Sequence, residues 1–380
     1  MSTRLARDLH PLAWWVWALG LAVAASLTTN PIALLMLVAV AGLVVACRRG
    51  DHPWSRSFRL YLMLGVFIVL IRVLFRIVFG GGDGTRVLFV LPEVPLPDWV
   101  LGIRLLGPVT LESVLAGLYD GLRLATLVIC IGAANSLANP KRLLRSVPPA
   151  LYEVGTALVV ATSVLPQLSD SLRRVRAAHR LRGAAGGRLQ VLRRLVVPVL
   201  EDALERSMRL AAGMDARGYG RAGTLTRAQR QVTGLLMLTG LAGICVGSYA
   251  MLDQTAPRWL AGPMLALGVV AAFGGLLAAG RRVQRTRYRP DRWRPGEVAV
   301  ALSGVVTAAV MYAVATRDFA VAYPVLTETP TLSLGALLGI LVGALPAVVA
   351  PPPRQASASA APTEVTSVGA SAPELAEVSR

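Results

Sequence analysis

Residues 60–79 read LYLMLGVFIVLIRVLFRIVF, and this stretch decides the class of the protein. Arg72 and Arg76 are its only charged residues. A helix needs about 20 apolar residues to cross roughly 30 Å of hydrocarbon. The stretch therefore predicts a transmembrane helix.

The composition of the whole chain agrees with this interpretation. Of 380 residues, 54% are hydrophobic and only 16% are charged, whereas a soluble domain carries about 25% charged residues. We therefore expect an all-α polytopic membrane protein with about eight spans. The seven other apolar runs are Leu12–Leu27, Ile32–Cys47, Val114–Ala134, Val232–Leu252, Trp259–Ala279, Val298–Ala315 and Leu332–Ala350.

The positive charge is gathered between these runs. The net charge is +18, and Lys141 is the only lysine. The basic blocks are Arg48–Arg59, Lys141–Arg145, Arg173–Arg230 and Arg281–Arg294. Cytoplasmic loops carry such an excess, so we expect both termini in the cytoplasm and the lipid bilayer as a partner. No nucleic-acid recognition motif is present, and we expect no nucleic-acid partner.

Catalytic, metal and cofactor sites are not expected. The three cysteines and three histidines are scattered without metal-ligand spacing. The chain has no GxxxxGK[ST] phosphate loop and no HExxH motif. We therefore predict a protein that is not an enzyme.

One apolar stretch, Val154–Leu168, breaks the alternation of the spans because basic blocks flank it on both sides. It is also short for a crossing. We expect it to lie in the membrane interface, or to dip in and return, and to lead into a cytoplasmic region over Ser169–Arg230. These boundaries divide the chain into residues 1–140 (N-terminal spans), 141–230 (cytoplasmic and interfacial helices), 231–350 (C-terminal spans) and 351–380 (a disordered tail).

The cytoplasmic region has helical periodicity. Gly183–Gly187 separates two predicted helices. In the second, apolar and charged residues occupy opposite faces. The apolar face holds Leu192, Leu195, Val196, Val199, Leu200, Leu204, Met208 and Ala212, and the charged face holds Arg193, Arg194, Glu201, Asp202, Glu205, Arg206 and Arg209.

Both predicted helices end in Arg-Gly, as Arg182-Gly183 and Arg217-Gly218. Glycine suits a helix C-cap in a left-handed conformation, and arginine in the last turn is favoured by the helix dipole. A capped helix end alone would explain a single copy. Two copies on adjacent helices favour docking arginines that pair with carboxylates of a partner.

These features resemble the transmembrane T component of energy-coupling factor importers, which includes the cobalt-transport Q subunits. The resemblance covers most of the chain to about Arg294. It rests on the order of His10-Pro11, Asn30-Pro31, Asn139-Pro140, Pro148, Leu165-Pro166, Arg182-Gly183 and Asp215-Ala216-Arg217-Gly218-Tyr219.

The resemblance implies a coupling subunit in a prokaryotic cell membrane. Two ABC-type ATPase subunits would bind the two motifs, and a membrane-embedded substrate-binding component would carry a vitamin or a transition-metal ion. The residues implied in ATPase coupling are Arg182, Gly183, Asp215, Ala216, Arg217, Gly218 and Tyr219. Leu181 departs from the family pattern, which has a small residue there.

Two other transport functions stay open from the residues. A self-contained secondary transporter would use ionisable groups in the spans, namely Arg72, Arg76, Glu112, Asp120 and Arg123. Asp120 and Arg123 have the spacing of an intrahelical pair. A permease that itself forms the substrate path is the other alternative.

Overall fold

The computed structural model describes residues 8–50, 57–79, 84–92, 106–146, 151–181, 188–218, 226–253, 255, 257–280 and 293–352. The chain divides into two compact units. The first comprises Met1–Leu9, Gly20–Leu137 and Ser303–Arg380, and the second comprises His10–Leu19 and Ala138–Leu302. Two of the four boundaries between the units, at residues 19–20 and 302–303, fall within helices.

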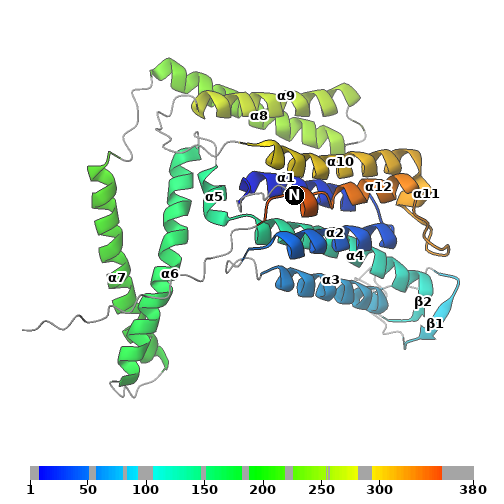
Figure 1. The fold of residues 1–380 in the computed structure, drawn as a ribbon, viewed down its shortest axis with the longest axis horizontal. Helices are drawn as coiled ribbons and strands as arrows, with labels where there is room; N and C mark the ends of the chain where they lie inside the picture. Colours follow the sequence, from blue (N-terminus) through cyan, green and yellow to red (C-terminus); the bar gives the residue numbers. More distant parts are fainter. Residues whose placement is uncertain are drawn as a thin grey trace, which may run out of the picture. The chain divides into compact units, whose positions relative to one another are not determined.

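Helices form most of the described chain (Figure 1). They are α1 (Pro11–Ser26), α2 (Pro31–Arg48), α3 (Phe58–Phe79), α4 (Leu111–Leu137), α5 (Pro140–Arg145), α6 (Tyr152–Leu181), α7 (Arg188–Ala216), α8 (Arg227–Leu252), α9 (Arg258–Gly280), α10 (Pro295–Arg317), α11 (Phe319–Ala322), α12 (Leu334–Val342) and α13 (Pro346–Val349). A short antiparallel pair, β1 (Val87–Val90) and β2 (Pro108–Thr110), completes the described secondary structure.

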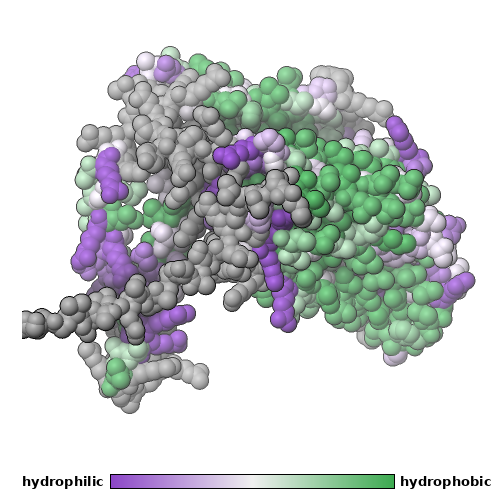
Figure 2. Space-filling model, in the orientation of Figure 1, coloured by the Kyte–Doolittle hydropathy of each residue, from purple (hydrophilic) through white to green (hydrophobic). Residues whose placement is uncertain are grey.

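Within the described residues, six helices are long and apolar enough to cross a membrane: α2, α3, α4, α8, α9 and α10. The helix α1 and the stretch Leu334–Val349 are apolar but shorter. The predicted all-α polytopic membrane fold is confirmed, and each of the eight predicted runs is helical. Figure 2 shows a largely apolar surface over the helices of the first unit, as lipid contact requires.

In the first unit, α2 packs against α4 and against α12 and α13, and α3 packs against α4. Small residues let α3 and α4 approach closely. A methyl group at Gly121 would lie 3.0 Å from the Cα of Val69, and one at Gly117 would lie 2.9 Å from Cγ of Arg76. Such small-residue contacts are the usual way in which helices associate in lipid.

The C-terminal helices belong to this unit and are tied to the start of α2. Asn30 is fully buried, and its Nδ2 donates to the carbonyls of Val321 and Thr331 at 2.9 and 2.8 Å. Its Oδ1 accepts from the N–H of Ile32 and caps α2. At the other end of α2, the Arg48 guanidinium donates to the carbonyls of Ala347 and Val348. Residues beyond 300 therefore complete the packing of the first spans.

The expected intrahelical pair of Asp120 with Arg123 is wrong. Asp120 instead pairs across helices with Arg76 at 3.4 Å. The Arg123 guanidinium donates to the carbonyl oxygen of Ser26. The close α3–α4 packing brings Arg76 within reach of Asp120.

In the second unit, α6 packs against α5 and α7, and α8 packs along α9. The alternative in which Val154–Leu168 dips into the membrane and returns is wrong, because α6 runs through it as one helix. Pro166 lies inside α6 without ending it. An interfacial position for the stretch stays a prediction.

Candidate functional site

The helices α6 and α7 form the predicted two-helix element, with 30 and 29 residues. At 1.5 Å per residue each is about 45 Å long. Neither is among the helices apolar enough to cross a membrane. Figure 1 shows the two meeting over part of their length and diverging beyond it.

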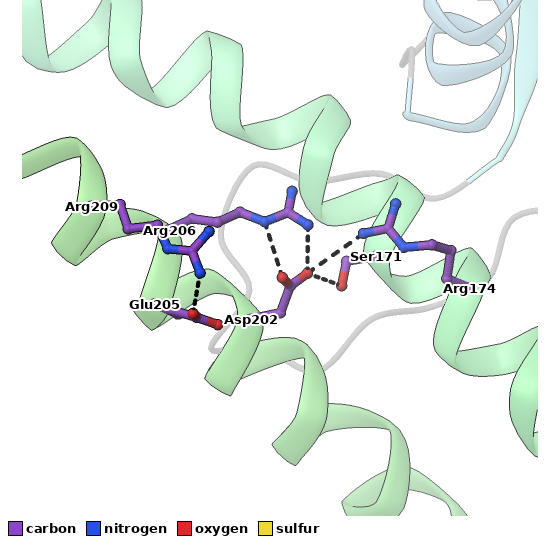
Figure 3. Close-up of polar contacts among 6 residues, drawn as sticks. All are labelled: Ser171, Arg174, Asp202, Glu205, Arg206 and Arg209. Carbon is purple, nitrogen blue, oxygen red and sulfur yellow. Dashed lines mark hydrogen bonds and ion pairs between the residues drawn. The ribbon is translucent and has the colours of Figure 1, made fainter. Parts of the chain in front are cut away.

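The contact between them is centred on one carboxylate, Asp202 of α7 (Figure 3). Ser171 of α6, only 3% exposed, donates its hydroxyl to Asp202 Oδ2 at 2.5 Å. Arg206 donates to both carboxylate oxygens, at 3.0 and 2.9 Å. Arg174 of α6 adds an ion pair at 3.6 Å. Asp202 thus joins α7 to α6 through the Ser171 hydroxyl and the Arg174 guanidinium, while Arg206 holds its carboxylate from within α7.

These partners fix the charge of Asp202. The hydrogen bond from Ser171 has the largest effect and lowers the pKa of the carboxyl group. Desolvation raises the pKa by less than that, and the Arg206 and Arg174 guanidinium groups lower it further. A lowered pKa means that the contact has its full strength above the pKa of the unfolded chain. The strength is lost as the pH falls through the lower value in the folded protein. The Asp202 side chain is about one-third exposed, so salt also screens its ion pairs.

The amphipathic division of α7 expected from the sequence does not describe how the helix packs. The side chain of Asp202, placed on the charged face, lies between the helices. Leu200, Leu204 and Met208 of the apolar face are 60–66% exposed, and Val196 is exposed as well. Spaced by four residues, these side chains form one stripe, which we call the α7 apolar stripe.

The second Arg-Gly motif lies at the C-terminal end of α7. Gly218 has φ 74°, the left-handed conformation that its position predicts. Its N–H donates to the carbonyl of Asp215 at 2.9 Å, and that of Arg217 donates to Met214 at 3.1 Å. Asp215, Ala216 and Arg217 are exposed. The helix thus ends abruptly and leaves the Arg217 guanidinium accessible.

Part of the predicted coupling set lies outside the described residues, namely Arg182, Gly183 and Tyr219. The helix α6 ends at Leu181, directly before the first motif, and Leu181 is 90% exposed. The structure therefore places a helix end at each motif. It does not bring the described residues of the second motif together with other charged groups in an enclosed site.

Sequence reasoning missed two residues of the α6–α7 contact, Ser171 and Arg174. The spacing of Asp202 and Arg206 on one helix indicates their pairing, but no pattern in α6 marks its partner residues. No group of three metal-ligating side chains occurs among the described residues.

Together these features define a multi-pass helical membrane protein with a two-helix element outside the spans. The model of a protein family described as cobalt transport protein, CbiQ, matches residues 2–227. The chain belongs to this family, the family of T components of energy-coupling factor transporters, and the resemblance stated from the sequence is confirmed. No curated protein matches the chain. A role in membrane transport follows from the family.

Proposed function

We propose that this chain is the transmembrane coupling subunit of an energy-coupling factor importer. It transmits ATP-driven motion from two ABC-type ATPase subunits to a membrane-embedded substrate-binding component for a vitamin or a transition-metal ion. The chain itself hydrolyses no ATP, and both its termini lie in the cytoplasm. The observation that carries the proposal is the accessible Arg217 at the capped end of a long helix outside the spans.

The length of α7 supports two separate ATPase sites. The first motif precedes Arg188, where α7 begins, and the second follows Ala216, where it ends. At 1.5 Å per residue, about 43 Å of helix separates them. One groove on one subunit cannot hold both ends, whereas two subunits can hold one each.

The α7 apolar stripe supports the third partner. Leu200, Leu204 and Met208 expose most of their side-chain surface on a helix whose opposite side carries the polar contact with α6. Burial of such side chains is worth about 1.5–3 kcal/mol each. We assign the stripe to the membrane-embedded substrate-binding component, so that movement of α7 reaches that component directly.

The ionisable residues in the spans give less support to a self-contained secondary transporter. Arg76 and Asp120 are paired with each other, and Arg123 is bound to a backbone carbonyl. These contacts hold α3 to α4 and α4 to the end of α1. The contacts of Arg76, Asp120 and Arg123 therefore explain these three residues as parts of the helix packing, without a proton or ion path.

The test is Arg217→Glu in the full chain, expressed with candidate ATPase subunits from the same genome. Loss of an interface arginine costs about 2–4 kcal/mol, about 30- to 1,000-fold in affinity. We expect the ATPases to be lost on co-purification, while the variant still inserts into the membrane.

The matched control is Arg173→Glu, the same charge reversal at an exposed residue of α6 away from both helix ends. It should leave ATPase binding unchanged. Equal ATPase recovery with wild type and Arg217→Glu would remove the docking role of Arg217.

A further inference from the structure

The strand β1 exposes four consecutive apolar side chains. Val87, Leu88, Phe89 and Val90 are between 45% and 72% exposed. Successive side chains of a strand point to opposite faces, so both faces of β1 carry exposed apolar side chains. The partner strand β2 differs from β1 in burial, because its residues Val109 and Thr110 are buried.

The strand is fixed to the ends of two membrane-spanning helices. Glu112, in the first turn of α4, accepts a hydrogen bond from the Thr85 hydroxyl at 2.8 Å. The N–H of Leu111 donates to the carbonyl of Arg86 at 2.8 Å, and that of Leu106 donates to Val78 of α3 at 2.7 Å. These bonds set β1 at the level where α3 ends and α4 begins.

This level is a membrane surface, because α3 and α4 both qualify as spans. The last turns of α3 also expose Leu74, Phe75 and Phe79. The apolar surface of β1 therefore continues the lipid-facing surface of α3. In contact with water, this continuous apolar surface would stay exposed, at a free-energy cost proportional to its area.

Backbone polarity limits how deep the strand can lie. In the described part of the chain, β1 pairs with β2 alone, so one edge has N–H and C=O groups without ladder partners. Such groups are not tolerated in the hydrocarbon core. The boundary between headgroups and acyl chains accepts both the apolar side chains and the polar edge. Arg86, exposed beside the strand, has the chemistry to bind lipid phosphate there.

We infer that β1 is an interfacial membrane anchor, with Val87–Val90 inserted at the headgroup boundary of the leaflet at this end of α3 and α4. Its partner is the lipid surface itself. A protein strand added to the free edge of β1 is the weaker fit, because it would leave both apolar faces uncovered. Lipid covers both faces at once.

The test uses single-cysteine variants of the full chain with Cys47, Cys130 and Cys245 replaced by alanine. Phe89→Cys and Val90→Cys report on opposite faces of β1, and Thr329→Cys reports on an exposed polar loop of the same unit. Each variant is labelled with an environment-sensitive fluorophore. It is then reconstituted alone into vesicles of phosphatidylcholine and phosphatidylglycerol.

We expect iodide to quench the label at positions 89 and 90 at least about threefold less than at 329, and shallow spin-labelled lipids to quench it more than deep ones. Equal iodide quenching at all three positions would overturn the inference. So would protection of only one face, or protection that appears only after other membrane proteins are added. Stronger quenching by deep than by shallow lipids would overturn the interfacial position.

Discussion

Two helix pairs of the second unit are held together in opposite ways. The pair α8–α9 packs backbone to backbone through glycines along its length. A methyl group at Gly240 would lie 2.5 Å from the amide nitrogen of Ala272, and one at Gly247 would lie 2.5 Å from that of Leu265. The pair α6–α7 instead depends on the polar cluster around Asp202.

The difference follows from the surroundings of each pair. Lipid offers no hydrophobic gain for bringing two apolar helices together, so close van der Waals packing over small residues must hold α8 to α9. Outside the spans, the carboxylate of Asp202 holds α7 to the hydroxyl of Ser171 and the guanidinium of Arg174 on α6. A contact concentrated at one point lets two long helices change their angle without breaking an extended interface. The proposed coupling function needs that property, because the two helices would have to follow moving ATPases.

The largest effect is expected in the α8–α9 pair, where glycines bring the two backbones into contact. A methyl group at Gly243 would lie 2.8 Å from the Cα of Gly268. Gly243→Leu must therefore push α8 away from α9, and we expect a loss of about 1–3 kcal/mol in stability. Thermal unfolding of the full chain in mild detergent should show a midpoint several degrees lower.

Gly234→Leu is the matched control in the same helix, because no atom of the described chain lies within 4 Å of a methyl group there. It should be neutral or slightly stabilising, since leucine favours helix more than glycine does. Equal midpoints for the two variants would show that glycine packing does not hold α8 to α9.

A smaller and different effect is expected in the other pair. Asp202→Asn keeps an acceptor for Ser171 but removes the charge that binds Arg206 and Arg174. We expect the unfolding midpoint to change by less than about 2 °C. The distribution of distances between spin labels at Ala161 of α6 and Ala212 of α7 should broaden, because the ion pair that helps hold the two helices at Asp202 is lost.

Glu205→Gln is the control, because Glu205 pairs within α7, with Arg209, and not with α6 in the described part of the chain. It should leave the distance distribution as in the wild type. If Asp202→Asn also leaves it unchanged, the polar cluster does not set the angle between the helices.

The smallest effect is expected from pH. The pKa of Asp202 lies below its usual range, so the carboxylate stays charged from pH 7 down to about pH 4. The same distance distribution should be constant over that interval and broaden only below it. The Asp202→Asn variant should not show that acid-dependent broadening. Broadening of the wild type already between pH 7 and pH 5 would contradict the role of Asp202.

Local patterns predicted much of this molecule. Length and hydrophobicity are properties of a single segment, so the apolar runs identified the spans. The left-handed Gly218 is also local, because only the residue itself and the helix before it decide the conformation. The pair of Arg-Gly motifs could also be identified from the residues, and the family resemblance assigned both to ATPase coupling.

Contacts between distant segments were beyond reach. Asp120 has a partner at helical spacing in Arg123, yet it binds Arg76 because α3 packs closely on α4. Asn30 binds Val321, 291 residues further on. The periodicity of α7 indicates two faces but not which face meets α6, since that depends on where Ser171 lies in space. Tertiary packing decides each of these contacts.

The most direct test of the coupling function is the composition of the complex that contains this chain. The tagged full chain, extracted in mild detergent from its own membranes, is analysed by native mass spectrometry. The proposal predicts one copy of the chain with two ATPase subunits and one small hydrophobic membrane protein, whose identity would indicate the cargo. Recovery of the chain without ATPases, under extraction that preserves a known membrane complex, would contradict the coupling function and favour a self-contained transporter.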